Sequence, residues 1–320
     1  MIPEMTTRRV IGLGALNVDR IFRVERLLSD GENAVEEGGS FAGGSAANTI
    51  YGLGILGIPT GFCGAIGDDA GGQLLLDDFT RSGTETSHVI TIPGVTSGTA
   101  FCLSSPRERS LYVLAGANRL LTDESLFIPF INNGGFLHIS SFVDDLQFEM
   151  SLRTIQKISP GVRLSFAPGS LYISRGTKAI QPFIERAEVL FINRSEIEKL
   201  MGQDFRKAAA SVLAMGCKSV AVTMGEGLMS GGRKIAAYVR DRNDEWLIDT
   251  GEIQPSQVVD TTGAGDAFAS GFLAGMLDGK TPDECGRLGN CEAVLSLKCI
   301  GARGGLPTRR ALLEFYKELY

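Results

Sequence analysis

From residue 135 onward, short apolar segments alternate with amphipathic ones, and this alternation constrains the fold more than any other feature of the chain. The apolar segments have the length of buried strands, whereas the amphipathic segments repeat their apolar residues at helical spacing. The predicted strands are 135–140, 162–167, 188–192, 219–223 and 235–239, and the predicted helices are 146–158, 176–186, 195–201 and 205–215. Strands and helices that alternate through short connections are typical of an α/β fold, in which helices cover both faces of a mostly parallel sheet.

The first part of the chain follows the same pattern except at two hairpins. We expect a strand over 8–16, a helix after the glycines of 41–57, a strand over 60–66 and a helix over 70–82. Short strands at 19–28 and 33–41, and again at 99–103 and 110–114, interrupt the alternation. Isolated two-stranded ribbons are marginally stable, so we expect the two hairpins to pair into one small sheet. Residues 1–320 are therefore predicted to form a single domain that carries this small sheet.

The composition argues against several classes of function. The 37 acidic residues outnumber the 31 basic ones, and no basic block interrupts them, so nucleic acid is not an expected partner. The longest apolar runs are about ten residues, too short to span a membrane, and Asn17 ends the first run too early for a signal peptide. Six cysteines without a C-x-x-C pair are typical of reduced thiols. We therefore expect a soluble, cytoplasmic protein with no membrane partner.

Residues 258–272, with the sequence VVDTTGAGDAFASGF, contain a glycine-rich turn that leads into an apolar helix. The first amides of a helix lack partners within the helix, and its dipole places partial positive charge there, so such a turn can bind an anion. Thr261 or Thr262 is the expected N-cap. Asp266 falls in the first turn, where it can accept a proton from a hydroxyl group. An ordinary capped helix with glycines for close packing is the alternative on residue types alone.

This run resembles the C-terminal motif of the PfkB family of ribokinase-like sugar and nucleoside kinases, which reads D-T-x-G-A-G-D. The run Gly43-Gly44-Ser45-Ala46-Ala47-Asn48, followed by residues 64–69, resembles the family's N-terminal motif, G-G-x-x-x-N and then G-x-x-G-x-D. The resemblance extends over about residues 10–313. It implies a three-layer α/β/α sandwich with a small β-sheet lid, about 19–41 and 98–114. It also implies transfer of the γ-phosphoryl group of ATP to a primary hydroxyl of a sugar or sugar derivative.

The resemblance also implies roles for residues at the acceptor end of the site. Asp266 would be the catalytic base, and the amides of an anion hole would bind the charge on the transferred phosphoryl group. That anion hole consists of Gly263, Ala264 and Gly265, and the acceptor-binding residues are Asp19, Gly43, Gly44 and Asn48. The chemistry agrees, since paired glycines let the backbone approach a polar ligand and an asparagine both donates and accepts hydrogen bonds. On residue types alone, tight packing of helix on strand would also explain the glycines.

A second group of matches concerns the nucleotide and its ions. Asn193 and Glu196 match an N-x-x-E motif that is associated with placing Mg²⁺ through water, although a helix cap would use the same residues. Thr223 and Gly225 match a turn beneath the nucleotide, and Asn290 falls where the family often has a residue near the adenine. Asp260 and the carbonyl of Thr262 match two ligands of a potassium ion, but residues 301–308 match the rest of that site poorly. ATP and Mg²⁺ are thus the implied cofactors, and dependence on potassium is open.

The identity of the acceptor is where the sequence stops being informative. Ser45 replaces a lysine of ribokinases, and residues 140–142 lack their glutamate, which disfavours ribose itself. Lid aromatics would suit a nucleoside base, or would equally form a lid core or a homodimer interface; they are Phe22, Phe41, Phe101 and Tyr112. We favour a sugar kinase, and a nucleoside kinase of the adenosine, inosine or cytidine type is the alternative.

Two further classes of function are weighed against a kinase. A non-catalytic sensor on the same fold is disfavoured because Asp266 and the complete anion turn are retained. An NAD-dependent oxidoreductase is disfavoured because Asn17 stands at the third glycine of G-x-G-x-x-G.

Overall fold

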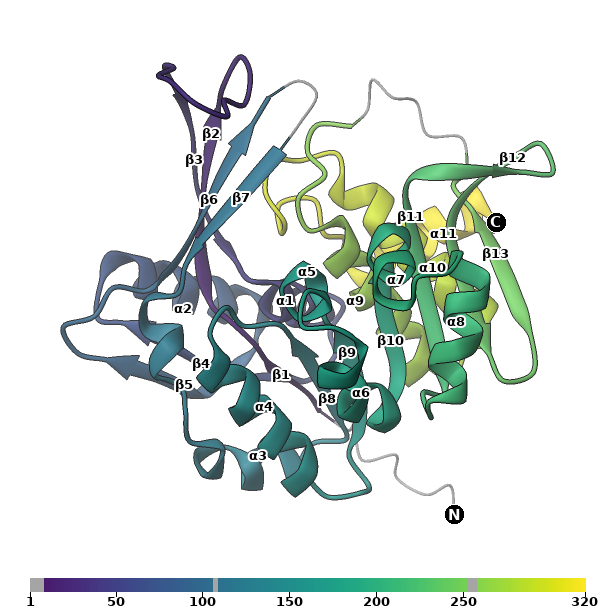
Figure 1. Ribbon diagram of the computed structural model, residues 1–320, viewed down its shortest axis with the longest axis horizontal. Coiled ribbons are helices and arrows are strands. Elements are labelled where there is room, and N and C mark those ends of the chain that lie inside the picture. The colour runs from purple at the N-terminus through teal and green to yellow at the C-terminus, as the bar shows by residue number, and fades with distance from the viewer. Residues whose placement is uncertain (1–8, 106–108, 252–257) are drawn as a thin grey trace.

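The computed structural model describes residues 9–105, 109–251 and 258–320, which form a body of helices and strands with a small sheet extending from it (Figure 1). The body contains a nine-stranded sheet in the order β13-β12-β11-β10-β9-β8-β1-β4-β5. Its strands are β1 Val10–Leu13, β4 Thr60–Gly67, β5 Glu85–Ile92, β8 Phe136–Ser140, β9 Arg163–Ala167, β10 Ala187–Asn193, β11 Ser219–Ser230, β12 Arg233–Asp241 and β13 Glu245–Asp249. The pairings from β5 through β11 are parallel, whereas β12 pairs with β11 and with β13 in antiparallel fashion. The predicted mostly parallel sheet is therefore confirmed.

Helices lie on both faces of this sheet. They are α1 Ser45–Ile55, α2 Ala70–Ser82, α3 Ile128–Asn132, α4 Asp145–Lys157, α5 Gly169–Ile173, α6 Thr177–Arg186, α7 Arg194–Met201, α8 Phe205–Ala214, α9 Ala264–Leu277, α10 Pro282–Ser296 and α11 Arg309–Leu319. Two short 3₁₀ turns, η1 Gly116–Leu120 and η2 Glu124–Leu126, follow the lid. Within the described ranges, none of the helices is both long and apolar enough to cross a lipid bilayer.

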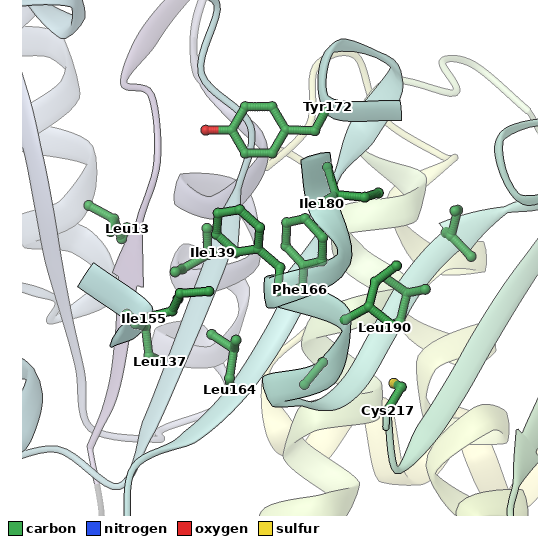
Figure 2. Close-up of a cluster of buried hydrophobic side chains, with 14 of the residues drawn as sticks. Leu13, Leu137, Ile139, Ile155, Leu164, Phe166, Tyr172, Ile180, Leu190 and Cys217 are labelled. Carbon is green, nitrogen blue, oxygen red and sulfur yellow. The ribbon is translucent and has the colours of Figure 1, made fainter. Parts of the chain in front are cut away.

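Alternate residues of the central strands contribute to two separate cores. In β10, Leu190 and Ile192 pack into one core, whereas Val189 and Phe191 pack into the other. The first core also contains side chains of α4, α6, α7 and α8, and Figure 2 shows part of it. The second core contains side chains of α1, α2, α9 and α10. The body is therefore the three-layer α/β/α sandwich that the sequence predicted.

The two hairpins form one small sheet, as predicted. This lid has the order β3-β2-β6-β7, with β2 Asn17–Arg23, β3 Glu36–Gly43, β6 Gly98–Ser104 and β7 Arg109–Leu114. Strands β2 and β6 join the hairpins through a parallel pairing, in which Asp19 lies beside Ala100. Because β2 follows β1 after only three residues, the lid begins at the carboxyl edge of the main sheet (Figure 1).

The lid has two chemically different faces because side chains alternate along its strands. Asp19 faces Gly43, at the base of the lid. Phe22 lies three residues farther along β2 and therefore on the opposite face, where its ring stacks on Phe101 at a centroid distance of 6.5 Å. Tyr112 pairs with Phe101 across β6 and β7 and is 60% exposed. The aromatic cluster of Phe22, Phe101 and Tyr112 thus points away from the side that carries Asp19.

Candidate active site

The glycine-rich turn before α9 forms an open helix N-terminus. Gly263 is the N-cap and has a φ of 75°, and a Cβ atom there would come within 2.4 Å of the Ala302 Cβ, so only glycine fits. The expected N-cap at Thr261 or Thr262 is therefore wrong. Thr262 instead donates from its amide and its hydroxyl to Asp260 Oδ1, at 2.9 and 2.7 Å. Among the described residues, no side chain caps α9, and the Ala264 amide makes only a long hydrogen bond of 3.4 Å to the Thr261 carbonyl.

Space for a ligand exists beside Gly265. A Cβ atom built on Gly265 would meet no described atom within 4 Å. Since Gly265 is the second residue of α9, this open space adjoins the first turn of the helix. An anion can therefore approach the positive end of the helix dipole without displacing a described side chain.

The Asp266 carboxylate projects from this first turn and is held by the start of a second helix, α1. Ser45 Oγ donates to Asp266 Oδ1 at 2.7 Å, and Asn48 Nδ2 donates to Asp266 Oδ2 at 2.8 Å. The hydroxyl of Thr49 also donates to the Asp266 carbonyl, at 3.2 Å. Two glycine-rich helix starts that are far apart in the sequence therefore converge on one carboxylate.

The remaining residues predicted to bind the acceptor lie around this carboxylate. A Cβ atom on Gly43 would lie 2.2 Å from Asp19 Oδ2, so the side chain of Asp19 rests directly on the backbone of Gly43. Gly44 is the N-cap of α1 with a φ of 100°, and a Cβ atom there would collide with the Ala15 carbonyl oxygen. The structure thus brings Asp19, both glycines and Asn48 together at the base of the lid, next to Asp266.

The residues predicted to bind the nucleotide lie at the end of β10 and within the neighbouring strand β11. Asn193 ends β10 and is the register partner of Thr223 in β11. Asn193 Oδ1 accepts from the Glu196 amide at 2.9 Å, and Glu196 Oε2 accepts from the Asn193 amide at 3.2 Å, which completes a capping box. Burial raises the pKa of the Glu196 carboxyl, and its hydrogen bonds to Asn193 oppose this shift. Gly225 lies in the irregular part of β11, with open space beside it.

The other predicted residues are held by contacts within the protein. Asn290 is buried on α10, where its Nδ2 donates to the Asp249 carbonyl at 3.2 Å and to the Tyr320 hydroxyl at 2.9 Å. Asp260 Oδ2 accepts from the Gly301 amide at 2.9 Å, which ties the anion turn to the loop after α10. No group of three or more His, Cys, Asp or Glu side chains within the described ranges could form a metal site on its own.

Comparison with known proteins identifies the family of this chain. Residues 7–309 match the model of the pfkB family of carbohydrate kinases. The chain belongs to the PfkB family. An uncharacterized sugar kinase of Archaeoglobus fulgidus is 36% identical over 267 residues, which cover 80% of this chain and 98% of that protein.

Solved structures of PfkB relatives share the fold. Arabidopsis thaliana ribokinase, solved with ribose and ATP, has a TM-score of 0.77 at 24% identity, and the match covers 97% of this chain and 99% of that chain. A putative ribokinase II of E. coli, solved with ATP and Mg²⁺, has a TM-score of 0.81 at 20% identity with the same coverage. This PfkB protein therefore has the ribokinase-like fold and is a carbohydrate kinase, a phosphotransferase with an alcohol group as acceptor.

Two residues next to this candidate site were not predicted from the sequence. Arg303 lies in the loop after α10, and its Nε donates to Asn48 Oδ1 at 2.9 Å. Arg303 Nη1 donates to Asp78 Oδ2 on α2 at 2.7 Å, and Nη2 donates to the Gly43 carbonyl at 3.2 Å. Burial lowers the pKa of Arg303, and the Asp78 carboxylate opposes this shift. The only signal in the sequence is a charged residue between small ones, in the run Gly301-Ala302-Arg303-Gly304-Gly305.

Proposed function

We propose that this kinase transfers the γ-phosphoryl group of ATP to a primary hydroxyl of a sugar or sugar derivative, with Asp266 as general base. The observation that carries the proposal is the placement of the Asp266 carboxylate. It is fixed by Ser45 and Asn48 and lies in the same helical turn as Gly265, which has open space at its Cβ position. A proton acceptor and an anion site are thereby adjacent, as transfer of a phosphoryl group to a hydroxyl requires.

The proposed step moves one proton and one phosphoryl group. The acceptor oxygen forms a bond to the γ-phosphorus while its proton passes to Asp266, and the bond from that phosphorus to the β–γ bridging oxygen breaks, which releases ADP. The amides of Gly263, Ala264 and Gly265 donate to the phosphoryl oxygens as charge develops on them. Because these amides are fixed at the start of α9, they need no reorganisation during the reaction.

On the acceptor side, we assign the hydroxyl groups of the sugar to Asp19, Asn48 and the backbone of Gly43 and Gly44. Asp19 stands at the start of the lid, so closure of the lid would place its carboxylate over the bound sugar and exclude water from the phosphoryl group. The stacked aromatics Phe22 and Phe101 lie on the other face of the lid and are not placed to stack on a nucleoside base, whereas Phe41, the register partner of Asp19, shares the Asp19 face.

On the nucleotide side, we assign Asn193, Glu196, Thr223 and Gly225 to ATP, and Asn290 to the adenine end. The donor set fits Mg²⁺, which prefers oxygen ligands, keeps several waters and is held by one or two carboxylates together with phosphates. Bound with ATP near Glu196, the ion would supply charge that neutralises the phosphates. Asp260 and the Thr262 carbonyl would contribute to a potassium site at the same turn.

The outer face of the lid supports a homodimer. Phe22, Phe101 and Tyr112 share this face, and Leu114 on β7 adds a side chain that is 55% exposed. A small sheet with an uncovered apolar face is stabilised when a second copy covers it. None of the cysteines is joined to another by a disulfide and five of the six are buried, which supports a reducing compartment such as the cytoplasm.

The test of this function is an ADP-release screen across sugars, sugar phosphates and nucleosides, with ATP and Mg²⁺ present and with potassium added or omitted. We expect a sugar or sugar derivative to give the highest kcat/KM, and its product to carry the new phosphate on a primary hydroxyl by ³¹P NMR. Preferred turnover of a nucleoside would instead assign the site to the alternative acceptor class.

A further inference from the structure

The Arg303 guanidinium is buried behind the acceptor-binding residues. Its side chain is 6% exposed and that of its ion-pair partner Asp78 is 9% exposed. The rings of Tyr51 and Phe79 lie on the guanidinium, with centroids 5.1 and 5.5 Å from its central carbon. Burying an ion pair carries a large desolvation cost, so it is weak evidence for stability alone and calls for a reason connected with specificity or function.

Arg303 determines how the Asn48 amide is oriented. A guanidinium only donates hydrogen bonds and an ionised carboxylate only accepts them, so an amide between the two can satisfy both in a single orientation. Asn48 Oδ1 must face Arg303, at 2.9 Å, and its Nδ2 must face Asp266, at 2.8 Å. The flipped amide would place its NH₂ group against the guanidinium and its oxygen against the carboxylate. Arg303 therefore stabilises the rotamer of Asn48 that donates to Asp266.

The loop that carries Arg303 also contacts the glycine-rich turn before α9. The Gly301 amide donates to Asp260 Oδ2, and Ala302 packs against the N-cap Gly263. Three consecutive residues thus contact the anion turn, the start of α9 and, through Asn48, the Asp266 carboxylate. This loop can hold the base and the anion site in a fixed relative position.

We propose that Arg303 is a positioning residue for phosphoryl transfer, which acts through Asn48 on Asp266 and has Asp78 as its counter-ion. This inference rests on the proposed role of Asp266 as the base. Without Arg303, the Asn48 amide keeps its hydrogen bond to Asp266 but loses the donor that fixes its oxygen, so a side-chain donor to the Asp266 carboxylate is held less firmly. The consequence is a misplaced base, which lowers kcat while leaving the ATP site unchanged.

A double-mutant cycle between Arg303→Met and Asn48→Ala tests this proposal. We expect Arg303→Met alone to lower kcat by about 10- to 100-fold, the scale of a small misplacement of a catalytic group, with the KM for ATP nearly unchanged. In the Asn48→Ala background the same substitution should lower kcat by no more than about threefold, because the residue through which it acts is gone. An equal loss in both backgrounds would overturn the proposal.

Arg303→Met removes one of the two cations that pair with buried Asp78 and leaves only Arg81, at 2.7 Å from Asp78 Oδ1. The loss can destabilise the fold, so a paired variant is needed. Replacing both members, as Arg303→Met with Asp78→Val, removes the two charges together, and such replacements are often neutral or stabilising. Folding is checked by thermal melting and ATP binding. The paired variant should show the same loss of kcat as Arg303→Met, and wild-type kcat in the folded paired variant would contradict the proposal.

Arg153→Gln provides a control, since it breaks the ion pair of Arg153 with buried Glu124 on the body and should lower stability without lowering kcat. Loss of kcat in this control comparable to that of Arg303→Met would show that general destabilisation is the cause and would overturn the proposal. If Asp266→Asn keeps its activity, the proposed base fails. If Asp266→Asn is inactive but the cycle is additive, only the role of Arg303 fails.

Discussion

Glu292 is expected to make the stability of this kinase fall as the pH rises. Its carboxyl lies on α10, is fully buried and accepts no hydrogen bond from any described residue that meets normal geometry. Burial raises the pKa of Glu292 from 4.5 to about 8, and the nearby hydroxyl of Ser270 offsets only a smaller part of this shift. In the folded protein the group is therefore neutral at pH 7, whereas in the unfolded chain it ionises above pH 4.5.

The sign and size of the effect follow from this difference. Below pH 4.5 both states are protonated, and the stability associated with the neutral carboxyl is fully present. As the pH rises to about 8, only the unfolded chain releases its proton, which favours unfolding by about 1.4 kcal/mol per pH unit. Between pH 5 and pH 8 the loss is roughly 4 kcal/mol, or about 6 °C in Tm for a chain of 320 residues.

Glu292→Gln tests this reasoning because glutamine has nearly the same size and does not ionise. Thermal melts of ligand-free protein at pH 5 and pH 8 should show a Tm difference between variant and wild type that moves by about 6 °C in favour of the variant at the higher pH. Glu318→Gln, on the exposed surface of α11, is the matched control and should show the same difference at both pH values. A Tm difference for Glu292→Gln that is independent of pH would refute the reasoning.

Three further predictions concern the site and the lid. Gly265→Ala adds a methyl group into open space, so Tm should be equal or slightly higher while kcat falls about tenfold or more, because the methyl group blocks the anion site; unchanged steady-state kcat would argue against an anion at this turn. Asp19→Ala should weaken acceptor binding about tenfold or more with little effect on ATP binding, because hydrogen bonds to a charged group are lost. Separate calorimetric titrations of the two ligands measure this, and a selective loss of ATP affinity would assign Asp19 to the nucleotide instead. Tyr112→Glu introduces charge on the outer face of the lid and should convert a dimer to a monomer in light scattering, with kcat retained. If the variant is as dimeric as the wild type, the interface lies elsewhere.

Much of the fold could be predicted from the sequence because its signals are local. The strand–helix alternation after residue 135 defined the parallel sheet, and the two hairpins had too little core to stand apart, which predicted their pairing. Strand β5 was missed because it is only half-buried and mixes polar with apolar residues. The bounds of helix α10 were not predicted because the helix contains Gly286 and Gly289. Glycine has a low helix propensity, and these two allow close packing against neighbouring elements.

The candidate site divides in the same way. Residues in contiguous motifs, such as Asp266 and Asn48, could be predicted because a few neighbouring residues determine the chemistry of a helix N-terminus. Arg303 and Asp78 could not, because their roles depend on a contact between residues 225 positions apart that no local pattern indicates. The predicted N-cap of α9 was wrong because Thr262 hydrogen-bonds back to Asp260 and Gly263 takes the cap position with a positive φ.

The most direct test of the central claim is the kcat of Asp266→Asn with saturating ATP and acceptor. We expect a loss of about two to four orders of magnitude, the usual contribution of a general base, while ATP affinity and Tm stay close to those of the wild type. Thermal melting and ATP titration on the same preparation exclude misfolding as the cause. Retention of more than about a tenth of the wild-type kcat would contradict the assignment of Asp266 as the base, since a general base contributes about 100-fold or more.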